Sequence, residues 1–209
     1  VITDLHEIAN VAGMAGIDFC MDWANRLPLD LKFMAPSCVP ATPLETSGAT
    51  ISVDDIKALL GRPGVIGLGE MMNYPGVVAG FDDVLAKLEA ARGRPVDGHA
   101  PGLSGSDLDA YIAAGVMSDH ECTTYAEAVE KLSKGMYLMM REGSSEKNLE
   151  ALLPAVNQTT YTRCMLVVDD RSAADLNAQG DLDHVVRRAI ELGLDPIRAI
   201  QMATLCPAL

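Results

Sequence analysis

The stretch Val65-Ile66-Gly67-Leu68-Gly69-Glu70 is a short run of apolar residues and glycines that ends on a carboxylate. A continuous run of this kind is typical of a strand that is covered on both faces, as in a parallel sheet. The apolar part of this stretch, residues 65–69, predicts a strand that Glu70 follows, and six other runs have the same character, so the sequence predicts seven strands. The other six are residues 1–3, 31–35, 95–98, 115–118, 136–140 and 164–168.

Longer amphipathic stretches lie between these runs and predict seven helices. Some have helix signals, such as Ser52 before two aspartates and Gly135 after a helical run. Strands that alternate with helices predict an α/β fold with a parallel sheet. Two architectures fit seven units: a (β/α)8 barrel whose first strand lies upstream of Val1, or an open doubly wound sheet. The expected helices are residues 10–24, 53–60, 81–92, 106–114, 125–133, 145–153 and 183–192.

Polar side chains follow the predicted strands, and three of the four histidines, His6, His99 and His120, are among them. The carboxyl ends of the strands form the active-site face of a (β/α)8 barrel, which favours the barrel here. A single carboxylate after a strand is often only a helix cap. The repeated occurrence of histidine with carboxylates nevertheless indicates metal ligation. The carboxylates and arginines in these positions are Asp4, Glu70, Asp97, Asp119, Glu121, Arg141, Glu142, Asp169, Asp170 and Arg171.

The composition argues against several classes of protein, namely those that bind nucleic acid, bind anionic membranes or span a membrane. The 209 residues are 49% hydrophobic and have a formal net charge of −13, so we expect no binding to nucleic acid or to an anionic membrane. No stretch reaches the roughly 18 apolar residues expected of a membrane span. The five cysteines include no closely spaced pair, which predicts free thiols and a cytoplasmic location.

Three motifs carry a resemblance to a known family. They run from Glu70 to Val77, from Asp97 to Gly105 and from Ser118 to Glu121, and they resemble the signatures of the bacterial adenine deaminases, which are amidohydrolases. Similar stretches cover nearly the whole chain. These are residues 6–11, 36–42, 141–144, 169–171 and 203–204.

The resemblance implies a TIM-like (β/α)8 amidohydrolase barrel in which residues 1–209 supply strands 2–8. The first strand, with a His-x-His pair of metal ligands, and a small β-sandwich domain built from both chain ends are then expected to be missing. Two positions depart from the family pattern: Leu5 stands where the family usually has proline, and Cys206 replaces the usual asparagine. We therefore expect the 209 residues by themselves to be inactive or poorly metallated.

The resemblance also implies the reaction and the residues that perform it. Adenine and water would give hypoxanthine and ammonia, with two divalent metals, manganese first and iron or zinc as alternatives. Glu70 would bridge the metals, His99 and His120 would bind one of them, and Asp169 would be both a ligand and the proton acceptor. The remaining candidates are Glu121 for proton transfer and Asp4, Asp170 and Arg171 for contacts with the purine.

Several alternatives stay open at this point. The chain could belong to another amidohydrolase that acts on a cyclic amide or amidine, or it could be an inactive barrel fragment that binds a partner through an open sheet edge. Asp170 competes with Asp169 as the base, although Asp169 directly follows the apolar run. We expect adenine as the small-molecule partner and a homo-oligomer as the assembly.

Overall fold

The computed structural model describes residues 1–209, which form two compact units. The first unit contains residues 1–100 and 106–117, and the second contains residues 101–105 and 118–209. Each unit has its own parallel sheet, and each sheet follows the order of the chain. Successive strands within a sheet are joined through helices, as parallel pairing requires.

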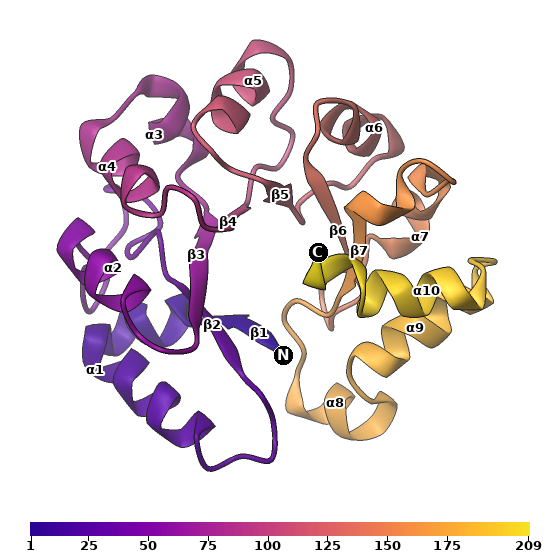
Figure 1. Ribbon diagram of the computed structural model, residues 1–209, viewed down its shortest axis with the longest axis horizontal. Coiled ribbons are helices and arrows are strands. Elements are labelled where there is room, and N and C mark those ends of the chain that lie inside the picture. The colour runs from indigo at the N-terminus through magenta and orange to yellow at the C-terminus, as the bar shows by residue number, and fades with distance from the viewer. The chain divides into compact units, whose positions relative to one another are not determined.

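The first unit has a four-stranded sheet in the order β1-β2-β3-β4 (Figure 1). Its strands are β1 (Ile2–Asp4), β2 (Lys32–Ala35), β3 (Val65–Met71) and β4 (Val96–Gly98). Leu68 and Met71 of β3 are fully buried, because helices cover the sheet. The helices of this unit are α1 (His6–Ala24), α2 (Val53–Leu60), α3 (Tyr74–Ala79), α4 (Asp82–Ala90) and α5 (Gly105–Ala113).

The second unit has a three-stranded sheet in the order β5-β6-β7. Its strands are β5 (Ser118–Asp119), β6 (Tyr137–Arg141) and β7 (Cys164–Val167). Leu138, Met140 and Leu166 of this sheet are buried against Val185 and Met202 of the helices. The helices are α6 (Tyr125–Ser133), α7 (Leu149–Leu152), α8 (Ala173–Gln179), α9 (Leu182–Glu191) and α10 (Pro196–Ala203), with short 3-10 turns at Leu153–Ala155, Tyr161–Arg163 and Cys206–Ala208.

All seven predicted strands occur, and all their pairings are parallel. The fifth strand was predicted to start at Gly115 but starts at Ser118, because Gly115 has φ 106° and ends the preceding helical segment. The sixth predicted helix, residues 145–153, is reduced to Leu149–Leu152, since an antiparallel bridge between Glu142 and Lys147 occupies the start of that stretch.

Three helices were not predicted: α3, α8 and α10. The helix α8 has no buried residue, so it lacks the apolar periodicity on which the prediction depended. Its start signal is nevertheless present, since Ser172 Oγ accepts the backbone N–H of Asp175. α10 begins with Pro196, whose fixed φ suits the first turn, after Asp195 caps the helix through the N–H of Arg198.

None of the helices combines the length and the apolar character that crossing a lipid bilayer requires.

The start of α2 provides a test of local stability. Ser52 and Asp55 form a reciprocal capping box, in which Ser52 Oγ accepts the Asp55 N–H and Asp55 Oδ2 accepts the Ser52 N–H. Replacing Ser52 by alanine should lower the free energy of unfolding by about 1 kcal/mol, because the backbone N–H of Asp55 loses its side-chain acceptor. Urea denaturation measures this change. Ser145→Ala, at an exposed position, is the control, and an equal effect of both substitutions would contradict the capping role.

Candidate active site

Asp4 and Glu70 meet at the carboxyl end of the first sheet. Asp4 is the last residue of β1, and Glu70 lies within β3, one residue before its end, rather than after the strand as predicted. Asp4 Oδ2 accepts the backbone N–H of Glu70 at 3.1 Å. Gly69 makes this approach possible, because a Cβ atom at that position would overlap the Asp4 carboxylate. The backbone of β3 therefore holds one carboxylate directly beside another.

His6 joins these two carboxylates from the first turn of α1. Its Nδ1 atom lies 3.2 Å from Glu70 Oε1 and 3.6 Å from Asp4 Oδ2. One donor atom from each of the three residues lies within 4.8 Å of the others. Asp4 Oδ1 and His6 Nδ1 are buried but take part in no hydrogen bond. Two unsatisfied polar atoms in one small cluster point to a ligand that would satisfy them.

The protonation of this cluster reflects its crowded negative charge. Burial, together with the neighbouring Glu70 carboxylate, raises the pKa of Asp4 above its usual value. Burial alone would lower the pKa of His6, but the interactions with Asp4, Glu70 and Glu7 outweigh it and raise that pKa to about 9. Without another cation, the His6 imidazole therefore holds a proton at neutral pH and supplies the only positive charge among the three.

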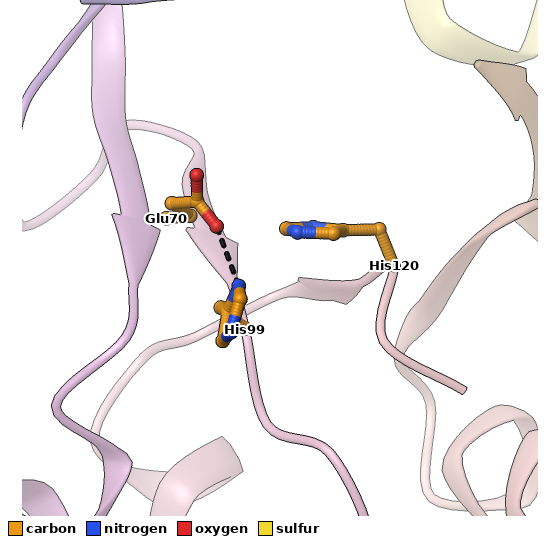
Figure 2. A group of neighbouring side chains, drawn as sticks. All are labelled: Glu70, His99 and His120. Carbon is orange, nitrogen blue, oxygen red and sulfur yellow. Dashed lines mark hydrogen bonds and ion pairs between the residues drawn. The ribbon is translucent and has the colours of Figure 1, made fainter. Parts of the chain in front are cut away.

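His99 approaches Glu70 from the end of β4. Its Nδ1 atom lies 2.6 Å from Glu70 Oε2, and Figure 2 shows the carboxylate turned toward the imidazole ring. The backbone N–H of His99 donates to Tyr111 Oη at 3.0 Å, and the Tyr111 hydroxyl donates to the carbonyl of Met71 at 2.8 Å. The fully buried Tyr111 thus ties the end of β4 to the end of β3. This link fixes the backbone that carries the His99 ring.

The residues of the first unit fit a divalent transition metal. Carboxylate oxygens and imidazole nitrogens are the ligand types that manganese, iron and zinc accept. Ligands at about 2.1 Å from one metal are separated from each other by roughly 3.0 to 3.5 Å, as follows from the bond lengths and angles of such sites. The 3.2 Å separation of His6 Nδ1 and Glu70 Oε1 falls in this range.

The second unit gathers a different set of charged side chains at the ends of its strands. His120 follows β5, and its Nε2 atom lies 3.4 Å from Glu121 Oε1 and 4.0 Å from Asp169 Oδ1. Arg141, the last residue of β6, is only 4% exposed. Its Nη1 atom lies 2.5 Å from Glu121 Oε1 and 3.4 Å from Asp169 Oδ2. The guanidinium therefore lies between two of the predicted catalytic carboxylates.

Asp169 and Asp170 differ in their surroundings. Asp169 has φ 61°, a left-handed conformation that is uncommon for a residue other than glycine. In this conformation the Asp169 carboxylate reaches Arg141 and His120, although both Asp169 and Asp170 are exposed residues. Strained backbone of this kind is often found at functional sites, where the surrounding structure maintains it.

Arg171 has contacts that hold the loop after β7. Its Nη1 atom donates to the carbonyl of Glu142 at 3.0 Å, and its Nη2 atom donates to Gln179 Oε1 at 2.9 Å. The observed contacts of Arg171 are structural, because they hold the loop in place. The predicted contact with the purine would be a second use of the same side chain. The buried Nε atom of Arg171 has no hydrogen-bond partner.

Within each unit the structure brings predicted site residues together. Asp4, Glu70 and His99 meet in the first unit, and His120, Glu121 and Asp169 meet in the second. The sequence placed His6 among the histidines that indicate metal ligation and Arg141 among the polar residues after strands, but it gave neither a specific role, although both contact these groups. Each follows an apolar run, so the positional signal that identified the other residues was present for these two as well.

Comparison with known proteins shows the family to which the chain is similar. A family model described as the amidohydrolase family matches residues 2–209. Adenine deaminase from Dehalococcoides mccartyi is 62% identical over 205 residues, which are 98% of this chain and 36% of that protein. Adenine deaminase from Syntrophobacter fumaroxidans is 52% identical over 208 residues, or 100% of this chain and 36% of that protein. The chain spans about a third of the length of these relatives. Because the family match covers nearly every residue, the chain belongs to the amidohydrolase family.

Proposed function

We propose that the full-length gene product hydrolyses adenine to hypoxanthine and ammonia. Relatives named adenine deaminase match almost the whole chain at identities of 50 to 62%. The convergence of Asp4, His6, Glu70 and His99 supports this function most directly, because the cluster has the ligand types and the unsatisfied atoms of a metal site. We also propose that both units belong to one (β/α)8 barrel, to which the chain contributes strands 2–8.

Metal binding would involve residues of both units in this proposal. Glu70 would bridge two metals through its two carboxylate oxygens, and His99, His120 and Asp169 would complete the ligands that this chain provides. Manganese is the first candidate, with iron and zinc as alternatives, since all three accept nitrogen and oxygen ligands. When bound, such ions supply Lewis acidity, which lowers the pKa of a water molecule.

The chain's own residues would carry the proton transfers. Asp169 accepts one proton of the attacking water while the water oxygen bonds to the ring carbon that bears the amino group. The ring nitrogen next to this carbon takes up a proton as the water adds. The proton on Asp169 then passes to the amino nitrogen, the carbon–nitrogen bond breaks and ammonia leaves, while the remaining hydroxyl proton returns to the group that protonated the ring nitrogen. Arg141 holds the carboxylates of Asp169 and Glu121 through its Nη1 atom, which lies 3.4 Å from Asp169 Oδ2 and 2.5 Å from Glu121 Oε1. Glu121 is then placed to exchange a proton with the purine ring.

The residues predicted to contact the purine have other contacts in the structure or none that points to a ligand. Asp4 is engaged with the Glu70 backbone and with His6, so a role in holding the metal site competes with the predicted purine contact. Asp170 is exposed after β7 and stays a candidate for such a contact. Arg171 would contribute mainly by keeping that loop against Glu142.

The adjacent aspartates allow a matched test of the proton acceptor. Asp169→Asn should lower kcat for adenine deamination by about 10² to 10⁴, the range typical for loss of a general base, because an amide cannot accept the proton. Asp170→Asn should leave most of the activity. Ammonia release from adenine by the purified full-length protein, loaded with manganese, measures both effects.

Other results of this assay would contradict specific parts of the proposal. Loss of activity in Asp170→Asn but not in Asp169→Asn would move the base by one residue. Equal activity of both variants with the parent protein would place the base elsewhere. A parent protein that hydrolyses a cyclic amide and not adenine would favour the alternative amidohydrolase function.

The bridging role of Glu70 is tested by metal content. Glu70→Gln should lower bound metal from two equivalents toward one or none, because a neutral amide is a much weaker bridging ligand than a carboxylate. Elemental analysis of the purified full-length variant gives the metal-to-protein ratio. Glu150→Gln removes a charge from an exposed glutamate and should leave the ratio unchanged. Equal metal content in Glu70→Gln and the parent protein would contradict a bridge at this position.

A further inference from the structure

Lys131 is a lysine in the last turn of α6 whose side chain is almost completely buried, at 1% exposure. Its Nζ atom lies 3.0 Å from Asp119 Oδ2 and 2.8 Å from Glu127 Oε1. Lysine is seldom buried to this degree unless it is paired. Here one ammonium group faces two carboxylates, one at the end of β5 and the other one helical turn away in α6.

Asp119 links Lys131 to the loop that follows β5. Its Oδ2 atom accepts the backbone N–H of Glu121 at 3.0 Å and that of Cys122 at 3.1 Å. The same oxygen is 3.3 Å from Cys122 Sγ, and both Asp119 and Cys122 are fully buried. The Lys131 ammonium therefore holds the acceptor on which the turn containing His120 and Glu121 is built.

Glu127 links Lys131 to a second loop. Its Oε1 atom accepts the backbone N–H of Gly102 at 2.9 Å, and its Oε2 atom accepts that of Thr123 at 3.3 Å. Gly102 belongs to residues 101–105, which lie in the second unit and follow His99 closely in the chain. One carboxylate, oriented by Lys131, thus holds backbone from both loops.

A neighbouring lysine, Lys134, contacts one of these loops. Lys134 Nζ donates to the carbonyl of Gly105 at 2.8 Å and lies 3.4 Å from Glu130 Oε1. Glu130 Oε1 in turn accepts the backbone N–H of Gly105. Lys134 is thus a second lysine at the end of α6, directly after its last residue, and it contacts the loop at residues 101–105 through Gly105.

We propose that Lys131 is a positioning residue that sets, through Asp119 and Glu127, the conformation of the loops at residues 101–105 and 120–123. This inference rests on the proposed function, in which His120 and Glu121 act at the site. Without the ammonium, the buried Asp119 carboxylate and the partly exposed Glu127 carboxylate would both lose the cation that they share. Each would then turn toward water and release the backbone N–H groups that it accepts.

Hydrogen exchange tests this coupling in the full-length protein. In Lys131→Met, peptides containing the amides of Gly102 and of residues 121–123 should exchange faster together, by on the order of tenfold or more, since each such amide loses a charged acceptor. Lys134→Met is the matched control and should accelerate exchange only near Gly105. Lys131→Arg keeps the charge and should retain most of the protection.

A thiol reaction gives a second measurement that needs no enzymatic activity. Cys122 is buried against Asp119, so Lys131→Met should increase alkylation of Cys122 by iodoacetamide, while Lys134→Met should not. If Lys131→Met does not fold, Asp119→Asn replaces it, since this variant weakens the same acceptor and should open residues 121–123 selectively. Exchange that rises uniformly over the protein, or that does not change in either loop, would overturn the proposal.

Kinetics then separate this inference from the proposed function. A positioning role predicts that Lys131→Met lowers kcat for adenine about tenfold or more at full metal content, with partial rescue in Lys131→Arg. A merely structural role predicts a lower melting temperature with an unchanged kcat, and that result would overturn the positioning role. A parent protein that is folded but does not deaminate adenine would refute the proposed function, whereas the exchange and alkylation results would still decide whether Lys131 holds the two loops.

Discussion

The carboxylate of Glu70 is the group around which the first unit organises its polar residues. Its Oε1 atom faces His6, its Oε2 atom faces His99, and its backbone N–H donates to Asp4. Asp4 belongs to β1, His6 belongs to α1, and His99 directly follows β4, so no single segment creates this environment. The close approach also depends on Gly69, since any side chain there would displace Asp4.

This concentration of negative charge requires a cation. The carboxylates of Asp4, Glu70 and Glu7 raise the pKa of His6 to about 9, so a protonated His6 imidazole supplies this positive charge. A divalent metal would compete with that proton, because imidazole binds metals in its neutral form. Asp4, His6 and Glu70 therefore form a group that could hold a metal ion in place of this proton.

The second unit neutralises its carboxylates with fixed cations. Arg141 lies between Glu121 and Asp169, and Lys131 lies between Asp119 and Glu127. Arginine and lysine keep their charge at neutral pH, so these carboxylates are held in place whether or not a ligand is bound. The two units thus differ in the source of their positive charge.

Much of the fold was predictable from local patterns. Apolar runs identified every strand, and α2 and α6 were predicted with the bounds that the structure shows. The pattern failed for α8, which buries nothing, and for the start of β5, where a glycine ends the previous helical segment. Asp4, Glu70, His99, His120, Glu121 and Asp169 were identified because residues that follow parallel strands gather at one edge of a sheet.

The sequence by itself determined the α/β class, the seven strands and the residue types at their ends, because these depend on the order and periodicity of residues along the chain. Only the tertiary structure decided which of those side chains meet. Asp4 and Asp119 both end a strand, yet Asp4 lies beside Glu70 and His6, whereas Asp119 is buried against Lys131. Likewise, His6 and Arg141 acquire their importance from neighbours that are distant in sequence, which folding alone brings within a few ångströms.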